Sequence, residues 1–169
     1  IGAAARNEPG RADRQRAQIL TAHGDALSWL DRDDGARVKY EAALEADPFF
    51  ADAHEGLGWV YWVADAYTAA IPHFQSALDL SPSSDALGGL ASSQFEADVI
   101  AADEAVTLYD AALAIEPDNR WVWRQKGWLQ LGEEQFEEAR DSFQSAVDLK
   151  NTDAAALEGL ALSYYHLDE

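Results

Sequence analysis

The sequence has no cysteine and no methionine, and it has no lysine or arginine between residues 40 and 119. Without cysteine the chain forms no disulfide and offers no thiolate to a metal ion. The stretch from 40 to 119 carries fifteen acidic residues, and their field would repel the phosphates of nucleic acids and anionic membranes. No apolar run approaches the roughly 18 residues needed to cross a bilayer. These absences argue against nucleic acid as a partner and against direct insertion into a membrane.

The ends of the sequence bear on its context. It begins with Ile1 and stops partway through a helical pattern. We therefore expect a piece of a longer protein, and the cellular compartment stays undetermined.

A pattern of small and apolar residues recurs about every 34 residues. Its clearest copy spans residues 51–84 and consists of Leu57, Gly58, Tyr61, Ala70, Phe74, Ala77 and Pro82. Recurrence at this period is typical of arrays of helical hairpins, in which each hairpin buries its apolar side against the next. The frame divides the chain into a lead-in at 1–16, repeats at 17–50, 51–84, 85–119 and 120–153, and a last helix at 154–169.

The third segment is irregular. Leu87, Leu90 and Ala91 match the first-helix positions only if its entry is one residue shorter and the link between its helices two residues longer. The last segment repeats the first-helix pattern alone, with Leu157, Leu160, Ala161 and Tyr164.

Small residues at fixed places have a physical purpose in such hairpins. Glycine or alanine at the eighth position and alanine at the twentieth let two helices cross closely. Aromatic residues at the eleventh and twenty-fourth positions fill the space beside that crossing, and proline near the end of the unit turns the chain. Asn151 stands where the fourth repeat would have this proline.

These sets resemble tetratricopeptide repeats over about residues 17–167. The resemblance implies an all-α fold, a right-handed superhelical solenoid of stacked antiparallel helix pairs, with about four repeats and a terminal helix. It also implies that the first helices of successive repeats line a concave groove for a peptide or a helix.

By that resemblance, the second, fifth, ninth and twelfth positions of each first helix face the groove. The first repeat places Gln18, Thr21, Asp25 and Ser28 there. The candidate partner-binding residues are Asp52, Glu55, Trp59, Trp62, Phe95, Trp121, Arg124, Trp128 and Tyr165. Large rings of this kind dominate binding hot spots, although the same rings could pack between helices or meet a second copy of the chain. Trp29 and Trp123 are expected in the core.

Catalytic and metal-binding signals are weak. The four histidines have scattered phases, without the i, i+4 spacing of a metal pair. Gly88 and Gly89 lack the Lys-Ser/Thr continuation of a phosphate loop. We expect no enzyme activity, no cofactor and no metal.

The resemblance thus implies an interaction scaffold that binds a protein or peptide in an aromatic, acidic groove. A basic and apolar segment is one candidate ligand, and the other interpretation of the acidic residues is a solvated coat that keeps the protein soluble. The clamp of lysine, asparagine and arginine with which some relatives hold a chaperone's terminal carboxylate is absent, since its places fall on residues such as Asp25 and Gly56. Two alternatives stay open: a self-associating structural module of a larger protein, and a glycan-binding array in polysaccharide export.

Overall fold

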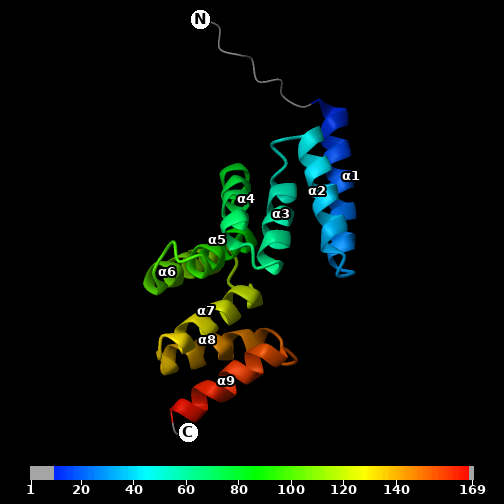
Figure 1. Ribbon diagram of the computed structural model, residues 1–169. Coiled ribbons are helices and arrows are strands. Elements are labelled where there is room, and N and C mark those ends of the chain that lie inside the picture. The colour runs from blue at the N-terminus through cyan, green and yellow to red at the C-terminus, as the bar shows by residue number, and fades with distance from the viewer. Residues whose placement is uncertain (1–9, 168–169) are drawn as a thin grey trace, which may run out of the picture. The chain divides into compact units, whose positions relative to one another are not determined.

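The computed structural model describes residues 10–167, and within them it contains helices and no strand (Figure 1). In each of the four repeats the first helix is followed by an antiparallel second helix, and the last helix repeats the first-helix pattern alone. The helices are α1 (Arg11–Ser28), α2 (Asp33–Ala46), α3 (Ala51–Val63), α4 (Tyr67–Leu80), α5 (Ser84–Glu96), α6 (Ala102–Ile115), α7 (Arg120–Gly132), α8 (Phe136–Leu149) and α9 (Ala154–His166). The predicted all-α helical-hairpin solenoid is confirmed. Most of the expected lead-in, residues 1–9, lies outside the described residues.

The chain divides into two compact units. The first ends at Ser81, and the second begins at Pro82. In the first unit, α1 packs on α2, α3 packs on α4, and α3 also contacts α1 and α2. In the second unit, α5 pairs with α6 and α7 pairs with α8, while α9 lies against α7 and α8. Contacts between first helices of successive hairpins therefore occur within each unit, as stacking of repeats requires.

The crossing within each hairpin is built from small residues and one buried ring. Ala36, Ala70, Ala105 and Ala139 stand at equivalent places in the second helices and are fully buried. The equivalent rings are Tyr40, Phe74, Tyr109 and Phe143. A Cβ on Gly58 would come within 2.7 Å of the Phe74 ring, and a Cβ on Gly127 within 2.8 Å of the Phe143 ring. Both glycines are therefore required for the close approach that the repeat pattern predicted.

Each hairpin turns through one residue with a positive φ. These residues are Asp31, Asp65, Asp98 and Glu134, with φ between 53° and 60°. Left-handed backbone is uncommon for residues other than glycine, and aspartate is among those that tolerate it best. The turn of the third hairpin occupies residues 97–101, whereas the second and fourth use only 64–66 and 133–135. The connection between α5 and α6 is therefore two residues longer than those of the second and fourth hairpins.

The last helix buries only one side. Ala156, Gly159 and Ser163 are buried, whereas Leu157 and Tyr164 are exposed. In complete hairpins the positions of Leu157 and Tyr164 face the second helix of the same repeat. The described residues include no such helix after α9, so these side chains face solvent.

No helix among residues 10–167 combines the length and the apolar character that a membrane span requires.

Candidate functional site

The first unit contains an open pocket of about 420 Å³ beside α1, α2 and α3. Its lining consists of Asp25, Ser28, Trp29, Tyr40, Asp52, Glu55, Gly56 and Trp59. Five of these residues (Asp25, Ser28, Asp52, Glu55 and Trp59) belong to the groove positions expected from the sequence. The volume falls in the range of about 300–1,000 Å³ that is usual for ligand pockets.

The Tyr40 ring forms part of the pocket wall. Its hydroxyl donates a 2.8 Å hydrogen bond to Asp25 Oδ1, which joins α2 to α1. Burial raises the pKa of Tyr40, and the hydrogen bond to Asp25 raises it further, so the phenol stays neutral and the donor role is secure. A Cβ on Gly24 or Gly56 would come within 2.5 Å of this ring. Two glycines from different helices therefore admit one aromatic ring between them.

Trp59 contributes the second ring of the pocket. It is half-buried, and its indole meets the Phe74 ring edge-on at a centroid distance of 5.0 Å and an angle of 77°. It also meets Trp62 edge-on at 5.9 Å, and Trp62 in turn contacts Tyr67. Trp59 is thus both a packing residue and a pocket-lining residue.

Three carboxylates surround these rings. Asp25 comes from α1, and Asp52 and Glu55 come from the first turns of α3. The residues that line the pocket include no lysine or arginine. The pocket therefore combines negative charge with aromatic surface, which suits a cationic side chain with an apolar stem.

Trp29 corrects one expectation. The sequence placed it in the core, but it directly follows α1, is 88% exposed and lines the pocket. The helix ends at Ser28, so Trp29 falls outside the buried stripe of α1. The repeat pattern does not reach the hairpin turn, and for this reason it missed Trp29 as a pocket residue. Tyr40 of α2 and Gly56 of α3 lie outside the four groove positions of the first helices and were missed for that reason.

The second unit repeats the Trp59 arrangement at a smaller scale. Trp128 lies edge-on to Phe143 at 5.0 Å and 76°, and with Phe95 it lines a hollow of about 130 Å³. Tyr109 also borders the hollow and forms a hydrogen bond with Ser92. This volume falls below the range of about 300–1,000 Å³ that is usual for ligand pockets.

The remaining candidate residues have other surroundings. Trp121 is half-buried and packs against the apolar cluster of α5, α6 and α7. Arg124 donates to both carboxylate oxygens of Asp153, at 3.3 and 3.1 Å, and so ties α7 to the start of α9. Tyr165 is 75% exposed on α9 and lies edge-on to His166. The structure thus groups Asp52, Glu55 and Trp59 in one pocket, and Phe95 and Trp128 in a second hollow.

The second tryptophan expected in the core is Trp123. It is half-buried, packs against apolar clusters of the second unit, and donates from Nε1 to the Pro117 carbonyl. Its neighbour Lys126 places Nζ 5.4 Å from the centre of the Trp123 ring.

The phases of the histidines along the sequence suggested that all four are scattered, but two of them lie together. His54 of α3 and His73 of α4 lie side by side, with their Nδ1 atoms 3.4 Å apart. Spacing along one helix could not reveal this pair, because its members come from the two arms of a hairpin. Within residues 10–167 there is no group of three or more His, Cys, Asp or Glu side chains arranged to hold a metal ion.

Comparison with known proteins places this geometry in a family. The sequence profile described as tetratricopeptide repeat matches residues 21–85, 102–154 and 124–169. No curated protein sequence matches the chain.

Solved structures resemble the fold at low sequence identity. PilF of Pseudomonas aeruginosa superposes with a TM-score of 0.79 and 19% identity, over 94% of this chain and 72% of its own. The MamA protein gives a TM-score of 0.69 and 21% identity, over 91% and 84% of the two chains. YrrB, a repeat protein with an unusual peptide-binding site, gives 0.64 and 22%, over 90% and 78%.

Proposed function

The chain belongs to the tetratricopeptide repeat family, and on that premise we propose that it is a non-enzymatic scaffold that binds a basic, apolar peptide segment in the pocket of its first unit. The repeat fold is that of protein–protein interaction scaffolds, and proteins of this family are in general non-enzymatic interaction modules. The finer proposal rests on one observation: three carboxylates and three aromatic rings converge on a pocket of about 420 Å³.

The chemistry of the pocket selects the ligand. A lysine or arginine side chain would place its cationic head among Asp25, Asp52 and Glu55, and its stem against the rings of Trp29 and Trp59. An acidic peptide would meet like charge. An apolar residue beside the basic one would cover the exposed indole of Trp29 and supply most of the buried area.

The first test uses synthetic peptides on the full chain. A peptide of alternating arginine and leucine is titrated by calorimetry, beside the same peptide with glutamate in place of arginine. We expect binding of the arginine peptide only, with affinity that falls as salt rises. Trp29→Ala and Asp52→Asn should each weaken binding about fivefold or more, whereas Ile115→Ala, an exposed apolar change on α6, should leave it within twofold. Equal binding of both peptides, or full binding by the pocket variants, would refute the proposal.

Self-association is the second candidate function. It is favoured by the exposed pair at the turn after α1, where Trp29 is 88% and Leu30 is 67% exposed. Sedimentation at several concentrations separates the two candidates: a dimer that Trp29→Ala dissociates supports self-association, and a strict monomer excludes it. Titration with oligosaccharides, followed by tryptophan fluorescence, tests the glycan alternative, and a peptide scaffold should give no response.

A further inference from the structure

The contact between α3 and α4 contains a pair of histidines that the peptide pocket does not use. His54 and His73 approach through Nδ1 atoms 3.4 Å apart, and both rings are partly exposed to solvent. They lie in the same hairpin of the first unit, so their spacing depends only on the packing of α3 on α4.

The outer nitrogen of His54 has its own partner. Nε2 lies 3.2 Å from the carbonyl oxygen of Pro48, which can only accept a hydrogen bond. Nε2 therefore carries the proton, and Nδ1 of the neutral ring presents a lone pair toward His73. A backbone carbonyl that holds the far N–H of an imidazole is the usual support of a metal-bound histidine.

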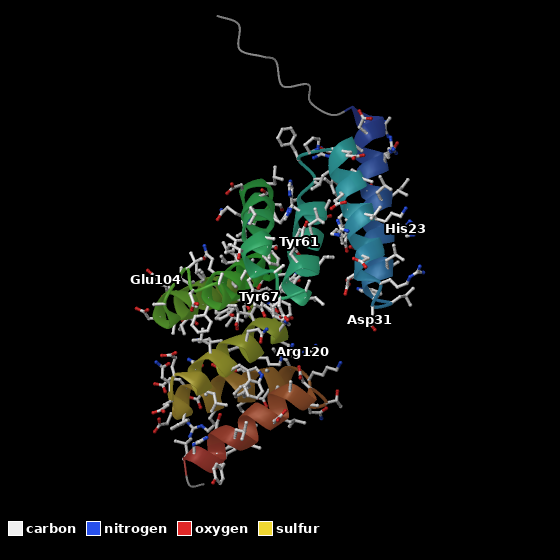
Figure 2. All side chains as sticks on the ribbon, in the orientation of Figure 1. His23, Asp31, Tyr61, Tyr67, Glu104 and Arg120 are labelled. Atoms are coloured by element: carbon white, nitrogen blue, oxygen red, sulfur yellow. The ribbon has the colours of Figure 1, made fainter. Side chains whose placement is uncertain are left out.

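The ring of His73 is held in place by Tyr61. The two rings stack at a centroid distance of 5.4 Å with an angle of 14° between their planes. Tyr61, labelled in Figure 2, belongs to α3, so the stack fixes His73 of α4 against the helix that carries His54. A neutral imidazole is the form that binds a metal ion.

The separation of the two nitrogens matches one shared ion. Two imidazole nitrogens that bind a tetrahedral zinc ion at roughly 2.0–2.1 Å lie about 3.4 Å from each other. We propose that His54 and His73 form a binding site for a divalent transition-metal ion of the zinc type, ligated by the two Nδ1 atoms and completed by water. Imidazole pairs suit Zn²⁺, Ni²⁺ and Cu²⁺ and discriminate against Mg²⁺ and Ca²⁺, which prefer oxygen ligands.

The charge around the pair favours a cation. The chain as a whole carries a formal net charge of −19, and His73 lies in the stretch without lysine or arginine. A bound ion would link α3 to α4 and so stabilise this hairpin by mass action.

The test is a calorimetric titration of the full chain with zinc chloride at pH 7. We expect one bound ion, at least tenfold weaker binding in His54→Asn and in His73→Asn, and affinity within twofold of the parent in two controls. The controls are His23→Asn and His166→Asn, which change the other histidines; His23, labelled in Figure 2, extends into solvent from α1. Binding that persists in the double variant His54→Asn/His73→Asn would overturn the proposal.

A second readout needs no variant. In a long-range ¹H–¹⁵N spectrum of the imidazoles, zinc should shift the Nδ1 signals of His54 and His73 and leave those of His23 and His166 in place. Absence of any shift at millimolar zinc would show that the pair merely shares a proton as a hydrogen bond, and would overturn the proposal. Magnesium chloride in place of zinc chloride should produce no shift.

Discussion

The hydroxyl of Tyr40 donates a 2.8 Å hydrogen bond to Asp25, and the same two repeat positions are in contact in all four hairpins. In the third hairpin they hold Ser92 and Tyr109, again joined by a hydrogen bond. In the second and fourth hairpins they hold tryptophan and phenylalanine, in edge-on contact at 5.0 Å. A tyrosine at the buried ring position therefore comes with a polar partner, and a phenylalanine comes with an indole, because a buried hydroxyl requires a hydrogen-bond partner.

Removal of that hydroxyl tests the pairing. Tyr40→Phe keeps the ring that packs beside Gly24 and Gly56 but loses the bond to Asp25. We expect the free energy of unfolding to fall by about 1 kcal/mol in urea titrations. Tyr165→Phe, at a side chain that is 75% exposed, is the control and should change it by less than about 0.5 kcal/mol. Equal stability of Tyr40→Phe and the parent would contradict the pairing.

The glycines at the hairpin crossing give a second prediction. Gly58→Ala and Gly127→Ala each place a methyl group against a fully buried phenylalanine ring. We expect each to lower the free energy of unfolding by about 1–3 kcal/mol through overpacking. Gly132→Ala is the matched control, because nothing lies within 4 Å of its added Cβ, and it should be neutral or slightly stabilising. Thermal and urea unfolding would measure all three.

The two kinds of tryptophan should separate stability from binding. Trp59→Ala removes a half-buried ring from Phe74 and is expected to cost about 1–2 kcal/mol of stability. Trp29→Ala removes a ring that is 88% exposed and is expected to cost less than about 0.5 kcal/mol. Both substitutions should weaken binding of the arginine–leucine peptide. Loss of the fold in Trp29→Ala would show that the indole is a structural residue.

The surroundings of Asp153 predict that the free energy of unfolding depends on pH. Burial raises its pKa, but the Ala156 N–H, Arg124 and Arg120 together outweigh burial, so the pKa lies below its ordinary value of 3.8. A carboxyl with a lowered folded-state pKa stabilises the fold above the unfolded value and loses that contribution as the pH falls through the folded value. Asp153→Asn keeps an oxygen that can cap α9 but loses the charge for both arginines.

We therefore expect Asp153→Asn to be less stable than the parent by about 1–3 kcal/mol at pH 7. The difference should begin to shrink as the pH falls below about 4, where the carboxyl of the unfolded chain takes up a proton, and should be lost once the pH passes the lowered folded-state pKa. Asp148→Asn, at an exposed aspartate of α8, should match the parent throughout. Urea unfolding at several pH values checks this, and a difference that does not depend on pH would contradict it.

The sequence by itself determined the helical-hairpin architecture. Small residues such as Gly58 and Ala70, and a ring such as Phe74, recur at a period of about 34 residues. Only close-packed helix pairs satisfy that spacing, and the contacts are local to each hairpin. The resemblance to tetratricopeptide repeats supplied Asp52, Glu55 and Trp59 as groove positions, and residues three and four apart share one face of a helix.

Only the tertiary structure decided which side chains meet across helices and which remain in solvent. Trp29 is exposed because it follows the end of α1, and the repeat pattern carries no information about such a turn. His54 and His73 meet because α3 and α4 are antiparallel, so residues nineteen apart in sequence come level with each other. Contacts of this kind depend on the rotation of each helix about its own axis, which packing sets and sequence spacing does not.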